Sequence, residues 1–154
     1  METSTRIVES LNELLTMELT AVNQYFLHSR LCASWGYESL AGHLRDIAFD
    51  EMRDAEQLID RLLYVGTIPN VQRMGSVKIG ETVPEQLSLQ RETERSALEL
   101  LSRAIAVCVE DGDQATREFL AAKLADEEKH LEWHETQLGL IERVGEQNYL
   151  TRQI

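Results

Sequence analysis

The sequence predicts an all-α fold: a four-helix bundle with one long crossover and a short fifth C-terminal helix. Apolar residues recur at helical spacing in four segments of the 154-residue chain. The only two prolines, Pro69 and Pro84, lie in one short central stretch, so the helices on either side can be long. No segment alternates apolar and polar residues as a half-buried strand does. The length fits one domain, residues 1–154.

The first helical hairpin is predicted at residues 5–34 and 38–65. The pair Trp35-Gly36 separates the two helices, because glycine commonly follows the last turn of a helix. Each helix carries a stripe of apolar residues that would face the core. The clearest members of these stripes are Ile7, Leu11, Leu14, Leu15, Leu44, Ile47, Leu58 and Leu62.

The second hairpin is predicted at residues 83–110 and 113–144, separated by Asp111-Gly112-Asp113, in which an acidic residue can cap the next helix. Its apolar stripes are marked by Leu87, Leu98, Leu101, Ile105, Phe119, Leu120, Leu124, Leu131, Leu138 and Ile141. Residues 146–154 are predicted to form a last short helical turn or two.

Residues 66–80 are predicted to be the long ordered connection between the hairpins, since they contain Pro69, Asn70 and Gly75. A helix of about 28 residues is about 42 Å long. Two such hairpins joined by one crossover that runs back along them form a four-helix bundle.

The charge of the chain excludes some classes of function. Its 27 Asp and Glu residues outnumber 15 Lys and Arg residues, giving a formal net charge of −12. We therefore expect no nucleic-acid or anionic-membrane partner, since both need a basic face, whereas cations would be attracted. The first residues lack the apolar core of a signal peptide, which favours a cytoplasmic protein. Cys32 and Cys108 lack metal-binding spacing and are expected to be free thiols.

Each long helix carries one glutamate inside its apolar stripe: Glu18, Glu51, Glu94 and Glu127. An unpaired buried carboxylate costs several kcal/mol, so four of them need a shared partner. Glu51 follows Glu18 by 33 residues, and Glu127 follows Glu94 by the same 33 residues. The alternative, four surface acids, is disfavoured by this matched spacing in the two halves of the chain.

The second half contains Glu127-x-x-His130 on one helical face, whereas the first half contains Glu51-x-x-Asp54. One Glu from each of two helices and Glu-x-x-His from the other two is the ligand pattern of di-iron and di-manganese carboxylate bundles. Oxygen ligands with one or two imidazoles suit iron or manganese better than copper or structural zinc. The sequence therefore predicts a two-metal centre in which Asp54 stands where symmetry predicts histidine.

The chain resembles the bacterioferritins over essentially its whole length. The resemblance is carried by residues 23–30 (NQYFLHSR), 50–53 (DEMR), 79–81 (IGE), 126–130 (DEEKH) and 147–150 (QNYL). It implies a ferritin-like bundle and a cage of 24 subunits. It also implies oxidation of ferrous iron and storage of iron as a ferric mineral.

The resemblance also implies roles for individual residues. Glu18, Glu51, Glu94, Glu127 and His130 match the ferroxidase ligands, with Glu51 and Glu127 bridging the two irons. Asp54 departs from the family, which usually has histidine there. Because aspartate is shorter and adds a negative charge, we expect a working but altered di-iron centre.

Met52 is the candidate haem ligand. It points about 100° around the helix from Glu51, and the residues on its side, with Leu19, Phe26 and Phe49, suggest a partner surface. On its own, such a methionine is usually an ordinary interface residue. In the resembling family the matching methionines of two subunits ligate haem b across a two-fold axis. Asn23 and Phe26 match that pocket, and Val22 and Arg45 are variations at its edge.

Several further side chains are weaker candidates. In the resembling family, Asp50 and a histidine at position 46 often form an iron site that lines the cavity, but this chain has aspartate at position 46. Asp46 and Asp50 could still attract iron, or they could form a solvated face.

Tyr25 and Trp133 are expected to pack in the core, with electron donation to the centre as the alternative that their helical phase allows. His28 is expected to pack or hydrogen-bond, and His134, one turn beyond His130, could lie next to the centre. No role is assigned to His43.

The sequence leaves three hypotheses about function open. The first is a ferroxidase cage whose haem receives electrons from a bacterioferritin-associated ferredoxin. The second is a haem-bearing subunit, weakened by Asp54, that assembles with a second bacterioferritin subunit type. The third, a di-metal oxygenase acting on an organic substrate, is disfavoured because that class usually needs a larger chain.

Overall fold

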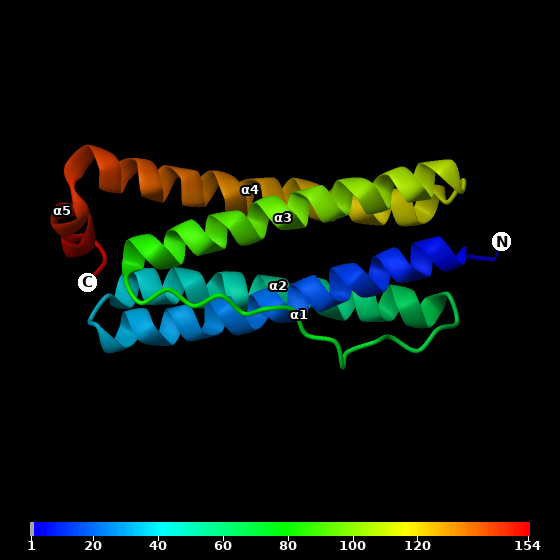
Figure 1. Cartoon of the computed structure of the whole chain (residues 1–154), viewed down its shortest axis with the longest axis horizontal. Helices are drawn as coiled ribbons and strands as arrows, with labels where there is room; N and C mark the ends of the chain where they lie inside the picture. Colours follow the sequence, from blue (N-terminus) through cyan, green and yellow to red (C-terminus); the bar gives the residue numbers. More distant parts are fainter. Residues whose placement is uncertain (1) are drawn as a thin grey trace.

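The computed structural model describes residues 2–154 and contains four long helices side by side, with a short fifth helix across one end (Figure 1). The elements are α1 (Thr5–Ser34), α2 (Glu38–Tyr64), α3 (Val83–Glu110), α4 (Gln114–Val144) and α5 (Glu146–Thr151). The predicted all-α bundle is therefore confirmed. The predicted long-helix bounds differ by one residue at two ends, because Val65 and Asp113 are cap residues rather than helical ones.

Three of the four long helices begin at a side-chain cap. Ser4 accepts a hydrogen bond from the backbone N–H of Ile7, and Thr82 accepts one from that of Glu85. The Asp113 side chain accepts from the backbone N–H of Thr116. These caps satisfy amide groups that a helix start leaves unpaired, which explains why the helices begin where they do.

The crossover between α2 and α3 runs back along the length of the bundle, beside α1 (Figure 1). Four polar side chains of α1 hold it, each through a hydrogen bond of 2.9 Å to crossover backbone. The pairs are Asn12 with Asn70, Thr20 with Gly75, Gln24 with Lys78, and His28 with Gly80. At Gly80 an added Cβ would lie 2.5 Å from the backbone nitrogen of Gln86, so only glycine fits this close approach.

The apolar core is divided into two clusters along the bundle. One contains Leu11, Leu58, Leu101 and Leu120, and the other contains Tyr25, Leu44, Leu87 and Tyr149, among others. On every long helix, the predicted glutamate falls between the residues of the two clusters. The fold therefore places four carboxylates at the middle of the bundle, with an apolar core on either side.

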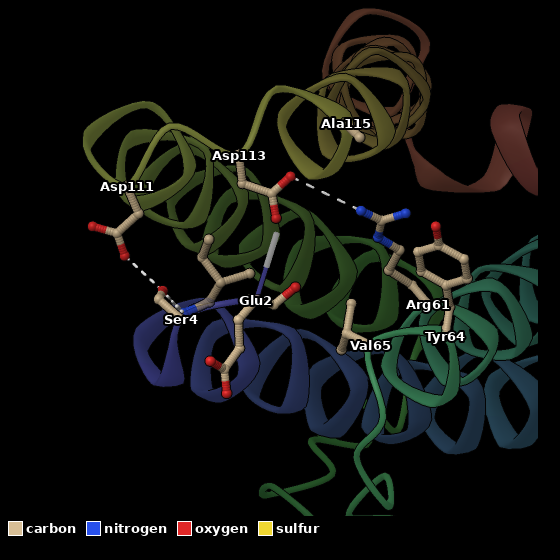
Figure 2. A pocket seen from close by; sticks show the side chains of 10 residues that line it. Glu2, Ser4, Arg61, Tyr64, Val65, Asp111, Asp113 and Ala115 are labelled. Carbon is tan, nitrogen blue, oxygen red and sulfur yellow. Dashed lines mark hydrogen bonds and ion pairs between the residues drawn. The ribbon is translucent and has the colours of Figure 1, made fainter.

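At the end of the bundle where the chain begins, a cavity of about 410 Å³ lies between the start of α1, the end of α2 and the α3–α4 turn (Figure 2). Ser4 donates a 2.6 Å hydrogen bond to Asp111, and Arg61 lies 3.9 Å from Asp113. These contacts connect the two hairpins at this end of the bundle.

Two other sequence predictions can be compared with the described residues. Cys32 and Cys108 are buried free thiols, as predicted. Within residues 2–154, the structure has no helix whose length and apolar character would let it cross a bilayer.

Candidate metal centre

The structure brings the four predicted glutamates together in the interior of the bundle. Glu18 of α1, Glu51 of α2, Glu94 of α3 and Glu127 of α4 are each at most 2% exposed. Their helices place them at the same level, because the two hairpins repeat the same 33-residue offset. His130 lies one helical turn after Glu127. Its Nδ1 atom is 3.1 Å from Glu51 Oε1 and 3.5 Å from Glu127 Oε2.

These side chains form two overlapping groups, within each of which one ligand atom per residue lies within 4.8 Å of the others. The first group is Glu51, Glu94, Glu127 and His130; the second is Glu18, Glu51, Asp54 and Glu127. Glu51 and Glu127 belong to both. The geometry therefore offers two adjacent cation positions that share two carboxylates.

Several polar atoms of the centre lack hydrogen-bond partners in the protein. Among residues 2–154, buried atoms without a hydrogen bond include Glu18 Oε2, Glu51 Oε1, Glu94 Oε2, both carboxylate oxygens of Glu127, and His130 Nδ1. Buried carboxylate oxygens are normally hydrogen-bonded, since an unmet one costs about 1–3 kcal/mol or more. Unmet oxygens that converge on one point, together with an imidazole nitrogen, fit a hard divalent cation such as ferrous iron or manganese.

The ionisation of the centre is strongly perturbed. Burial raises the pKa of Glu18 and Glu94 well above the usual range, and neighbouring acids add to the effect. Burial likewise raises the pKa of Glu51. Burial alone would raise the pKa of Glu127 too, but the neighbouring Glu94 carboxyl and His130 imidazole lower it. The metal-free centre therefore retains protons, which a bound cation would displace.

His130 carries the opposite perturbation. Burial disfavours its charged form, but the carboxylates of Glu127 and Glu51 outweigh burial and raise the pKa of His130 to about 10. The imidazolium supplies the positive charge of the first group in the absence of metal. A cation bound there would replace that proton at Nδ1.

Asp54 reaches the second group, but it has a partner that the sequence analysis missed. The ammonium of Lys123, on α4, lies 3.0 Å from Asp54 Oδ1 and 2.8 Å from Gln57 Oε1. The Lys123 side chain is only 4% exposed. A signal for it existed, since Lys123 lies four residues before Glu127 and therefore on the same face of α4. Burial raises the pKa of Asp54, although Lys123 opposes this shift.

Tyr25 supports the first group directly. Its hydroxyl donates a 2.5 Å hydrogen bond to Glu94 Oε1 and lies 3.2 Å from His134 Nε2. His134 is fully buried, and its Nδ1 lies 2.7 Å from the backbone oxygen of His130. Tyr25 was expected to pack in the core or to donate electrons, and His134 to lie next to the centre. In the structure both are hydrogen-bonded to residues of the centre.

A buried row of hydrogen bonds continues from His134 to the crossover. The Gln90 side-chain amide, which the sequence analysis missed, lies 2.9 Å from His134 Nε2 and 2.6 Å from His28 Nδ1. His28 Nε2 accepts the backbone N–H of Gly80. Burial lowers the pKa of both histidines to about 4, so both are neutral near pH 7. The row fixes the position of Tyr25 relative to the crossover.

The remaining polar candidates lie outside the two groups. Asp46 is exposed. Asp50 forms an ion pair with Arg53 and lies 3.8 Å from His130 Nε2. Asp50 also lines a cavity of about 500 Å³ between α2 and α4, with Asp54, Lys123, Asp126 and His130 among its other lining residues. This cavity lies directly beside the second group.

Trp133 and His43 stack on each other, with ring centroids 4.0 Å apart and an interplanar angle of 18°. Trp133 also meets the ring of His134 edge-on at 4.9 Å. These aromatic rings therefore extend from the buried His134 toward His43, which lies on the surface.

Met52 lies on a separate apolar surface formed by α1 and α2. Its side chain is 45% exposed, like those of Phe26 and Phe49. A shallow cavity of about 250 Å³ is lined by Val22, Asn23, Phe26, Ala48, Phe49 and Met52. Arg45 lies over the Phe49 ring, 5.1 Å from its centroid. Leu19, also expected on this side, is partly buried and packs against the core cluster that contains Leu11 and Leu58.

Comparison with known proteins places this geometry in a family. The ferritin-like domain family matches residues 8–144. A bacterioferritin of Streptomyces coelicolor is 45% identical over 151 residues, covering 98% of this chain and 90% of that protein. A bacterioferritin of Mycobacterium tuberculosis is 45% identical over 143 residues, 93% of this chain and 90% of that protein. A bacterial ferritin of Synechocystis is 40% identical over 149 residues, 96% of each chain. The bundle, the central carboxylates and these matches together show that the chain belongs to the bacterioferritins, within the ferritin-like family.

Proposed function

We propose that this protein stores iron: it oxidises ferrous iron at a centre inside each subunit and keeps the ferric product as a mineral in a 24-subunit cage. The observation that carries the proposal is the pair of adjacent ligand groups sharing Glu51 and Glu127, with unpaired buried oxygens aimed at both positions. Membership of the bacterioferritins supports it. The surplus of acidic residues, a net charge of −12, would concentrate cations at the protein.

In this proposal Glu51 and Glu127 bind both ferrous ions. Glu94 and His130 complete the first position, and Glu18 and Asp54 complete the second. Ferrous substrate displaces the protons that burial holds on Glu18 and Glu94, because only the ionised carboxylate is a good ligand. Each ion then gives up one electron, and the pair supplies the two electrons that reduce dioxygen to peroxide, or peroxide to water.

Stopped-flow oxidation tests the ferroxidase part of the proposal. With ferrous iron added to the demetallated protein in air, we expect a fast ferric absorbance phase that saturates at about two ions per subunit. Glu127→Gln removes a carboxylate common to both positions and should abolish this phase. A fast phase that is absent here and appears in Asp54→His would overturn the proposal of a working centre.

We also propose that Met52 binds haem b between two subunits. The surface around it fits this group, because a thioether sulfur lies in a shallow apolar pocket with two half-exposed phenylalanines. A second copy across a two-fold axis would supply the other thioether and cover the other haem face. When bound, haem would pass electrons from a ferredoxin to the stored mineral.

The haem proposal is tested by absorbance spectroscopy and size-exclusion chromatography. A spectrum typical of bis-methionine haem should be present after haem reconstitution and lost in Met52→Ala. The assembly should elute near 24 subunits of 17.6 kDa each. A haem spectrum that Met52→Ala leaves intact would contradict the assignment of Met52.

One observation favours a second candidate function. The pairing of Asp54 with Lys123 makes the second position unlike the first, as expected for a haem-bearing, ferroxidase-weakened subunit of a mixed cage. In that case the chain expressed alone would oxidise iron slowly, and addition of a second subunit type would restore the fast phase. The cytoplasm remains the predicted location in either case.

A further inference from the structure

Lys123 is a buried cation directed at one ligand of the centre. Its Nζ lies 3.0 Å from Asp54 Oδ1, 2.8 Å from Gln57 Oε1 and 3.5 Å from the Asp54 backbone oxygen. These contacts use the three donors of an ammonium group. The ammonium also lies over the Phe119 ring, with Nζ 4.9 Å from its centroid, and the side chain is only 4% exposed. The side chain is therefore held in one place rather than free to reach solvent.

The ammonium affects the two metal positions unequally. Asp54 belongs only to the group of Glu18, Glu51 and Glu127, and the first group has His130 in the corresponding place. The first position has three carboxylates and the imidazole of His130 as its ligands. The second position has four carboxylates, but Lys123 occupies Oδ1 of Asp54, so only three of them are free of a cationic partner. Lys123 cancels one of these negative charges from a site where solvent screens little.

We propose that Lys123 acts as a tethered cation that weakens binding of divalent metal at the Glu18–Asp54 position, so that the two positions fill one after the other. The inference rests on the proposed two-metal centre and adds a positioning residue to it. Lys123 orients Asp54 through its contact with Oδ1, and the positive charge of Lys123 repels a metal ion that approaches Asp54. Metal reaching this position through the cavity between α2 and α4 passes Lys123, which lines that cavity.

Anaerobic calorimetric titration of the demetallated protein with Co²⁺ tests the proposal. We expect two classes of site per subunit, the weaker at least tenfold weaker than the stronger. Lys123→Met should tighten the weaker class at least tenfold, whereas Lys123→Arg, which keeps the charge, should leave it weak. Lys129→Met is the matched control, since Lys129 lies on the same helix and lines the same cavity but is exposed. It should change neither class.

Lys123→Met leaves the partly buried Asp54 without its ion-pair partner, which destabilises the fold. A second variant therefore tests the same role without an unpaired Asp54. Asp54→His combined with Lys123→Met removes both charges and should bind Co²⁺ at the weaker class of site more tightly than Asp54→His alone, which keeps the ammonium. Two equal classes in the unaltered protein, or a weaker class that neither variant tightens, would overturn the role of Lys123. Binding of no Co²⁺ at all would overturn the two-metal centre itself.

Discussion

The unpaired carboxylates of the centre should destabilise the metal-free protein, and Glu18→Gln tests this. At pH 7 an unfolded glutamate with the ordinary pKa of 4.5 is ionised, whereas burial holds the proton on Glu18 in the fold. At about 1.4 kcal/mol per pH unit, retaining that proton costs at most roughly 3 kcal/mol at pH 7. Glutamine has nearly the same shape and no proton to retain. Glu18→Gln should therefore stabilise the demetallated protein, by up to that amount.

The assay is urea unfolding followed by circular dichroism at fixed protein concentration, with and without Co²⁺. At pH 5 the same calculation leaves a gain below about 1 kcal/mol, because the unfolded glutamate is then partly protonated. With Co²⁺ the order should reverse, since the variant loses a ligand of the second position. Glu13→Gln, at an exposed position of α1, is the control and should stay within about 0.5 kcal/mol. A Glu18→Gln protein no more stable than its parent at pH 7 without metal would refute the reasoning.

Three other predictions can be measured by urea unfolding of the demetallated protein. The folded pKa of His130, about 10, exceeds its ordinary value of 6.5, so its stabilising contribution is complete below pH 6.5 and disappears as the pH rises through 10. His130→Gln should remove this dependence of the unfolding free energy on pH. An unfolding free energy that varies with pH in the same way in the variant would contradict the prediction. Tyr25→Phe leaves Glu94 Oε1 without its donor and should cost about 1–3 kcal/mol, more than Tyr149→Phe, whose hydroxyl bonds Gln137 in a less buried place. Leu58→Ala creates a cavity in a fully buried cluster and should cost about 2–5 kcal/mol; a loss below 1 kcal/mol would show that the cluster is loosely packed.

The helices could be predicted from the sequence because their signals are local. Ser4, Thr82 and Asp113 cap helices within three residues of themselves, and apolar spacing shows which face of each helix is buried. The meeting of the four glutamates could also be predicted, since the 33-residue repeat places Glu18 and Glu94 at equivalent points of two hairpins. Long-range convergence was thus visible through an internal repeat.

The contacts that tune the centre could not be predicted in the same way. Lys123 and Asp54 are 69 residues apart, and only the packing of α4 against α2 brings them to 3.0 Å. Gln90 looks like an ordinary polar residue near the start of α3 until His28 and His134 are found on either side of it. Such contacts depend on the rotation of each helix within the bundle, which periodicity defines only approximately.

The haem surface illustrates a middle case. The side of α2 that carries Met52 was predicted from its angular distance to Glu51, and Phe26 and Phe49 are exposed beside it. Leu19 is partly buried against a core cluster, because it lies near the boundary between the core face and the outer face of α1.

The central claim is that two adjacent cation positions share Glu51 and Glu127. A crystal structure of the protein soaked anaerobically in ferrous iron, with iron located by anomalous scattering, tests it most directly. We predict one iron among Glu51, Glu94, Glu127 and His130, and a second, of lower occupancy at limiting iron, among Glu18, Glu51, Asp54 and Glu127. Iron found only at surface acids such as Asp46, with the four buried glutamates free of metal, would contradict the account.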